Sequence, residues 1–183
     1  MVVQEKLLTV QEFDEFVTRP ENADRLFEYI GGKIVEVVSN PYSSKIASRV
    51  NGFIFVYLSK HDIGHLTGAD GGYMVSGERY IPDVAFISYT RQPELSTVEG
   101  YVPNAPDLAV EVLSPGTTDE ELTIKVANYL AAGTVVWMVK PVEKRVVVFA
   151  PGSPARTLGI NDTLDGGERL PGFTLAVKAI FPE

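Results

Sequence analysis

IPDVAFI at residues 81–87 and DLAVEVL at residues 107–113 both have the apolar, β-branched composition that predicts a buried strand. Asp83 lies near the start of the first stretch, and Glu111 lies inside the second. An ionised carboxylate among such neighbours loses a large hydration energy unless a cation or a strong hydrogen-bond donor replaces the water. Two carboxylates in this setting therefore suggest a shared cation.

A helix is predicted after the second strand, over residues 118–133, because a Thr-x-x-Glu capping box begins this segment and a glycine ends it. Lys125 falls at the edge of the apolar stripe of this helix, and Tyr129 falls within the stripe, with its hydroxyl near the site. A helix that follows a strand by a short turn packs back over that strand, so the long Lys125 side chain can reach the carboxylates. Asp83, Glu111 and Lys125 are thus candidates for a metal-dependent hydrolytic site.

The rest of the chain alternates helix and strand patterns without a repeat or a linker. Within residues 107–113, the two-residue period places Glu111 and Ala109 on one face of the strand and Val110 on the other. We predict one α/β domain covering residues 1–183. Its other expected elements are a short helix from Thr9, a hairpin over 26–38 with a Gly-Gly turn, a helix over about 43–60, short strands over 63–88, strands at 135–139 and 145–149, and then short edge structure and a tail.

Composition restricts the class of protein. Hydrophobic residues make up 45% and charged residues 22%, which is the balance of an ordinary globular protein. The chain has no cysteine, so disulfides, thiolate metal sites and thiol nucleophiles are excluded, and a reducing compartment fits. Residues 1–6 lack the pattern of a secretory signal, and the apolar run at 53–58 is far too short to span a membrane. We predict a cytoplasmic protein that does not bind membranes.

The formal net charge of −8 counts against a nucleic-acid-binding protein, but an acidic chain can still carry a local basic strip. Lys45 and Arg49 lie one helical turn apart on the polar side of the helix at 43–60, where they could contact phosphates or only face solvent. His61 and His65 have the spacing of a metal pair on a helix. Gly64 between them indicates a helix end, which disfavours zinc.

Five motifs occur in order along the chain: FEYIGGK at 27–33, PDV at 82–84, PDLAVEVLSP at 106–115, KVANY at 125–129 and LPGF at 170–173. With this ordered set, the chain resembles the Uma-two family of restriction endonucleases, within the PD-(D/E)xK nuclease superfamily. The ordered set is more specific than any single motif, and the resemblance covers nearly the whole chain from about residue 9. The resemblance implies a restriction-endonuclease-like central mixed sheet flanked by helices, DNA as substrate, and magnesium or manganese as cofactor.

The resemblance also implies roles for the candidate residues. Asp83 and Glu111 correspond to the magnesium ligands, Lys125 to the catalytic lysine, and Glu28 to an accessory acid. The superfamily lysine commonly stands two residues after the second acid, where this chain has Leu113; the Uma-two pattern supplies it from the following helix. This donor set suits magnesium, which prefers oxygen ligands, keeps several waters and bridges carboxylates to substrate phosphates.

One departure from the family pattern leaves several functions open. Relatives often have a histidine shortly after the proline that follows the hairpin, and this chain has Ser43 in that stretch. Three classes therefore stand: a magnesium-dependent DNA endonuclease, a catalytically degenerate nuclease fold that binds nucleic acid or a protein partner, and a structural or oligomerisation domain. The third class leaves the buried acids unexplained. As an alternative to a metal site, Glu111 and Lys125 could also form only a structural ion pair. The choice between DNA and RNA and the formation of a homodimer also stay open.

Overall fold

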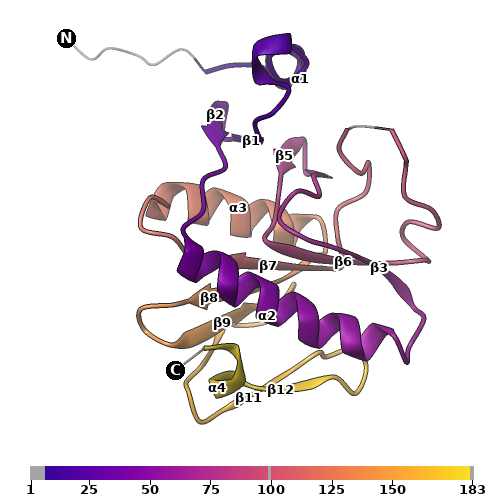
Figure 1. Ribbon diagram of the computed structural model, residues 1–183, viewed down its shortest axis with the longest axis vertical. Coiled ribbons are helices and arrows are strands. Elements are labelled where there is room, and N and C mark those ends of the chain that lie inside the picture. Colours follow the sequence, from indigo (N-terminus) through magenta and orange to yellow (C-terminus); the bar gives the residue numbers. More distant parts are fainter. Residues whose placement is uncertain (1–6, 99, 182–183) are drawn as a thin grey trace.

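A central sheet of six strands organises the computed structural model, which describes residues 7–98 and 100–181 (Figure 1). The strand order is β10-β9-β8-β7-β6-β3; β7 and β8 are parallel, and every other neighbouring pair is antiparallel. This arrangement confirms the predicted α/β class with a central mixed sheet. The strands are β3 (Gly64–Thr67), β6 (Val84–Ser88), β7 (Leu108–Val112), β8 (Val135–Lys140), β9 (Arg145–Phe149) and β10 (Arg156–Leu158).

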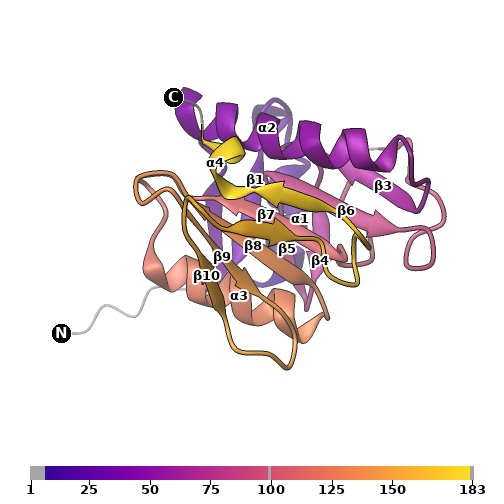
Figure 2. The same cartoon turned by 90° about the horizontal axis from the view of Figure 1, so that it is seen from below.

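Helices cover both faces of this sheet. Helix α2 (Pro41–Leu58) lies on one face and α3 (Asp119–Ala131) on the other (Figure 2). The capping box at Thr118 begins α3 as predicted. Helix α2 begins two residues earlier than expected, because the Asn40 side chain accepts hydrogen bonds from the first turn and a proline occupies the first helical position.

Alternation along β7 separates two kinds of environment. Leu108 and Val110 face α2 and belong to the main apolar core. Ala109 belongs to the cluster under α3, and Glu111 points to the same side. The sheet therefore presents an apolar face to α2 and carries its carboxylate toward α3, as the two-residue period predicts.

The N-terminal segment forms the predicted helix and hairpin and adds a second sheet beside the first. Gly31 and Gly32 both have positive φ, 58° and 84°, which is the backbone that a tight hairpin turn requires. The second sheet has the order β2-β1-β5-β4. Its elements and their neighbours are α1 (Val10–Val17), the 3₁₀ helix η1 (Pro20–Asn22), β1 (Phe27–Ile30), β2 (Lys33–Glu36), β4 (Tyr73–Val75) and β5 (Glu78–Tyr80).

The C-terminal part was predicted to be short edge structure and a tail; the short strands are confirmed, with β10 at the edge of the central sheet, but the tail is wrong. Strands β11 (Thr163–Asp165) and β12 (Thr174–Ala176) pair with each other, and the short helix α4 (Val177–Ile180) follows. Their apolar side chains enter the main core, where the Phe173 ring stacks on Trp137 at a centroid distance of 5.9 Å. Segments this short carry little periodic signal, and only the tertiary packing shows that they are buried.

Within the described ranges, 7–98 and 100–181, no helix has the length and apolar character needed to cross a membrane. The expectation that residues 1–6 are not a secretory signal lies outside these ranges. The cytoplasmic location and the oligomeric state stay predictions.

Candidate active site

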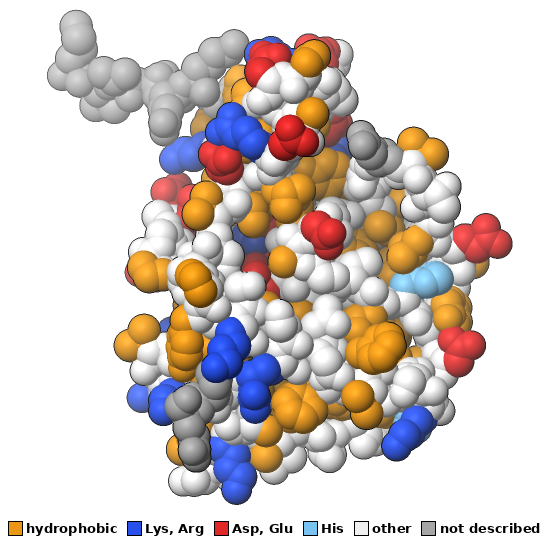
Figure 3. Space-filling model, in the orientation of Figure 1, with side chains coloured by type: hydrophobic (Ala, Val, Ile, Leu, Met, Phe, Trp, Pro, Cys, Tyr) orange, Lys and Arg blue, Asp and Glu red, His pale blue; other side chains and the backbone are white. Residues whose placement is uncertain are grey.

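Four chain segments bring the candidate residues to one cavity. Glu28 comes from β1, Asp83 from the bend that leads into β6, Glu111 from β7 and Lys125 from α3. All four line a cavity of about 310 Å³ beneath the β1–β2 hairpin. In the space-filling view, acidic and basic side chains lie on the floor of a hollow next to the N-terminal half of α2 (Figure 3).

Lys125 bridges two carboxylates at the floor of this cavity. Its Nζ lies 2.9 Å and 3.1 Å from the two carboxylate oxygens of Glu28 and 2.9 Å from Oε2 of Glu111. The side chains of Lys125, Glu28 and Glu111 are only 7%, 9% and 12% exposed. Solvent and salt screen a buried ion pair only weakly. These contacts therefore fix the position of the Lys125 ammonium.

Neutral donors complete the carboxylate contacts. The Tyr129 hydroxyl donates to Oε1 of Glu111 at 2.9 Å, and the Ile81 N–H donates to Oε1 of Glu28 at 2.6 Å. The Val112 N–H donates to Oδ2 of Asp83 at 2.7 Å. Since Val112 directly follows Glu111, this last bond ties the bend that carries Asp83 to the end of β7.

The site leaves Glu111 with too little compensating positive charge. Burial raises its pKa to about 7; the Lys125 ammonium opposes this shift, and the carboxylates of Glu28 and Asp83 add to it. Burial also raises the pKa of Asp83, although the hydrogen bond from the Val112 N–H partly offsets this rise. Burial alone would lower the pKa of Lys125, but Glu111 and Glu28 outweigh burial and raise it, so the ammonium stays charged.

The oxygen-rich cluster fits a hard divalent cation that keeps part of its water. Among the described residues, no group of three or more His, Cys, Asp or Glu side chains is arranged to hold a metal alone. Magnesium does not require such a cage, because one or two carboxylates with waters and substrate phosphate suffice. Asp83 and Glu111 can supply those two carboxylates. Three carboxylates around the single Lys125 ammonium give the excess negative charge that a cation would neutralise.

The histidine pair considered from the sequence does not lie on one helix. His61 follows the end of α2, where its ring stacks on Tyr57 at 4.2 Å. His65 lies in β3 and contacts the Pro93 carbonyl oxygen at 3.1 Å. The two rings belong to different elements, in agreement with the helix end that Gly64 indicates.

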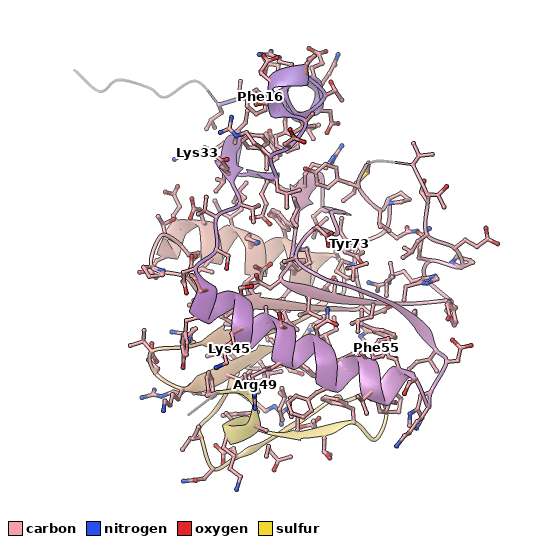
Figure 4. The ribbon with its side chains drawn as sticks, in the orientation of Figure 1. Phe16, Lys33, Lys45, Arg49, Phe55 and Tyr73 are labelled. Carbon is pink, nitrogen blue, oxygen red and sulfur yellow. The ribbon has the colours of Figure 1, made fainter. Side chains whose placement is uncertain are left out.

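The two basic residues of α2 lie apart from the acidic cluster. Lys45 is exposed, whereas Arg49 donates two hydrogen bonds to the Ala179 carbonyl, at 3.0 Å and 2.7 Å, and so holds α4 against α2 (Figure 4). Neither residue lines the cavity of Glu28 and Lys125. Their contact with DNA stays a prediction.

The backbone N–H donors of Ile81 and Val112 could not be predicted from the sequence, because every residue except proline has a backbone N–H and its orientation depends on the fold. Tyr129 was expected to pack in the core with its hydroxyl near the site, and its bond to Glu111 confirms this. Ser43, at the departure from the family pattern, is buried and donates from its hydroxyl to the Leu113 carbonyl at 3.3 Å. It therefore holds the end of β7 in place rather than facing the cavity of Glu28 and Lys125.

The fold defines a class of protein, the α/β proteins with a central mixed sheet covered by helices on both faces. Within this class the chain belongs to the Uma2 family, described as "Putative restriction endonuclease", whose model matches residues 11–178. This confirms the resemblance seen in the sequence motifs.

A solved structure shares the fold. It is the crystal structure of "a putative nuclease belonging to DUF820 from Anabaena variabilis ATCC 29413", with a TM-score of 0.80 and 23% identity. The similarity covers 92% of this chain and 96% of that chain. A comparison with curated proteins found no significant match.

Proposed function

We propose that the protein is a metal-dependent nuclease that hydrolyses phosphodiester bonds in DNA, with Asp83 and Glu111 as the ligands of magnesium or manganese. The observation that carries this proposal is the grouping of three carboxylates, from Glu28, Asp83 and Glu111, around the Lys125 ammonium in one cavity. There burial, with the neighbouring carboxylates of Glu28 and Asp83 adding to it, raises the pKa of Glu111 to about 7. A cation bound there would lower the pKa of an attacking water and stabilise negative charge on the phosphate.

Lys125 would act as a hydrogen-bond donor and not as a general base. Its pKa is raised by Glu111 and Glu28 against the effect of burial, so it has no free lone pair near neutral pH. An ammonium at this position can orient the attacking water or meet the charge that develops on the phosphate. Glu28 would hold Lys125 in this orientation through its two contacts, which is a positioning role.

A second candidate function rests on a specific observation. Lys125 already forms ion pairs with both Glu28 and Glu111 without a metal, which also suits a degenerate nuclease fold that binds nucleic acid or a partner without cutting it. The acidic net charge and the engaged Arg49 favour the same alternative. The two functions differ in hydrolysis, so cleavage decides between them.

Nicking of supercoiled plasmid in magnesium and in manganese tests the proposal. We expect metal-dependent nicking by the parent, loss of nicking in Asp83→Ala, and loss in Lys125→Met with metal affinity retained, because lysine does not coordinate the ion. Glu143→Ala, at an exposed residue outside the cavity, is the matched control and should nick like the parent. No nicking by folded parent in either metal, or equal rates in parent and Lys125→Met, would contradict the proposal.

A further inference from the structure

A second groove opens from Asp83 along the outer side of α2. Its volume is about 440 Å³, and it lies between α2 and the segment after β3 that contains Gly68 and Ala69. Ser39 and Asp83 line both this groove and the cavity of Glu28 and Lys125. The two hollows are therefore two arms of one cleft, and the proposed site lies where they meet.

One face of α2 forms the side wall of the groove. Ser44, Ser48, Asn51 and Phe55 follow one another at intervals of three or four residues, so they share this face. At 1.5 Å per residue, the wall from Ser44 to Phe55 is about 16 Å long, which is long enough to contact more than one nucleotide of an extended strand. The two serines are exposed, and Phe55 is 63% exposed.

The side chains of this wall can bind the phosphates of a nucleic acid by hydrogen bonds, without lysine or arginine side chains. Of the described residues that line the groove, only Asp83 carries a charge, and it is a proposed metal ligand. Serine hydroxyls and asparagine amides are common donors to phosphate oxygens. An exposed aromatic ring such as Phe55 offers a platform for an unpaired base, because every base has a face that can stack.

We infer that the α2 groove binds a single-stranded segment of nucleic acid that continues from the phosphate held at Asp83. Ser44, Ser48 and Asn51 contact its backbone, and Phe55 stacks on an unpaired base. This inference rests on the proposed function for the position of the reacting phosphate. Because the cleft continues on both sides of Asp83, the substrate is an internal segment of a strand whose bases are unpaired next to the site.

Gly52 provides a test in which only charge changes. It lies on the same wall in the middle of α2, and a Cβ added there would meet no atom within 4 Å. Both Gly52→Glu and Gly52→Gln should therefore fold, because either side chain favours a helix more than glycine does. Thermal melts of both variants check this.

Binding is measured by fluorescence anisotropy of labelled single-stranded DNA in EDTA, where metal-dependent hydrolysis cannot occur. We expect Gly52→Glu to bind about tenfold more weakly than Gly52→Gln, because the added carboxylate repels the phosphates. Phe55→Ala should bind about fivefold more weakly than the parent. A perfect duplex of the same sequence should bind more weakly than the single strand.

The outcomes separate this inference from the proposed function. Equal binding by Gly52→Glu and Gly52→Gln, or no binding by the parent, overturns the groove inference even if the parent nicks plasmid. The predicted binding pattern without metal-dependent cleavage of either plasmid or single-stranded DNA supports the groove and contradicts the hydrolytic function. A change of oligomeric state in Gly52→Glu with unchanged DNA binding would assign this face to a contact between two copies and would also overturn the inference.

Discussion

Strand β7 has a buried carboxylate near each end, and the two carboxylates have very different partners. Asp107, just before the strand, accepts a hydrogen bond from the Ser88 N–H at 2.8 Å and lies 3.4 Å from the guanidinium groups of both Arg91 and Arg169. Glu111, near the other end, shares the one ammonium of Lys125 with Glu28. The side chains of Asp107 and Glu111 are similarly buried, at 6% and 12% exposed.

The difference suggests how a structural acid, Asp107, can be distinguished from the acid proposed to be functional, Glu111. Two cations and a backbone donor neutralise Asp107, and they tie it to β6 and to the segment before β12. At Glu111 burial raises the pKa to about 7, the carboxylates of Glu28 and Asp83 add to this shift, and the Lys125 ammonium does not offset it. The Glu111 carboxylate also faces a cavity. Burial with incomplete charge compensation is the pattern expected of the proposed functional acid, whereas burial alone is not.

The largest effect is expected from removing the structural acid. Asp107→Asn leaves two guanidinium groups without their carboxylate, which we expect to cost about 4 kcal/mol of unfolding free energy. Urea denaturation of parent and variant measures this. The exposed pair of Arg156 and Asp165 offers a control, since Asp165→Asn should cost less than about 1 kcal/mol. An equally small loss of unfolding free energy in both variants would show that Asp107 is not a structural acid, and the contrast with Glu111 would fail.

Glu111→Gln should have the opposite effect in metal-free protein. The folded-state pKa of about 7 lies above the ordinary 4.5, so between these pH values the folded parent holds a proton that the unfolded chain has lost. The stability that Glu111 contributes is therefore fully present below about pH 4.5, decreases as the pH rises, and is lost above about pH 7. The total loss is about 3 kcal/mol of unfolding free energy. Glutamine has no such dependence.

Urea denaturation in EDTA from pH 4.5 to pH 8 checks this sign. We expect the unfolding free energy of Glu111→Gln to increase relative to that of the parent as the pH rises, so that the variant is the more stable protein at pH 8. A variant that is clearly less stable than the parent at pH 8 would make Glu111 a structural partner of Lys125, comparable with Asp107.

The smallest effect is expected at Tyr129, which acts through Glu111. Tyr129→Phe keeps the buried ring and loses the hydroxyl donor, at a cost of about 1 kcal/mol. The pKa of Glu111 should rise further, so manganese binding should shift to higher pH. Tyr73→Phe is the matched control, because this buried hydroxyl contacts Thr67 away from the acids. If manganese binding has the same pH dependence in both variants, Tyr129 only packs in the core and does not act on Glu111.

Much of the fold follows from local patterns in the sequence. The capping box at Thr118, the Gly-Gly hairpin turn and the apolar strands at Asp83 and Glu111 are local signals, and the structure contains each element they predict. The β11–β12 pair was missed because its strands are three residues each and their burial depends on distant contacts with Trp137. Such burial arises only from tertiary packing.

The candidate site was predictable in its members but not in its contacts. A charged residue in an apolar strand is visible in the sequence, and this marks Glu111. The approach of Lys125 to Glu111 follows from the predicted packing of the helix over its strand, but the sequence does not show that Lys125 also contacts Glu28, because that contact depends on how α3 and β1 pack. Nor does it show that the Arg49 guanidinium is occupied by the carbonyl of Ala179.

Isothermal titration calorimetry with manganese is the most direct test of the shared metal site. We predict that the parent binds manganese at pH 8, that Asp83→Ala and Glu111→Gln each lose this binding, and that Lys125→Met keeps it because lysine is not a ligand. Unchanged manganese affinity in both Asp83→Ala and Glu111→Gln would contradict the assignment of these two carboxylates to a metal.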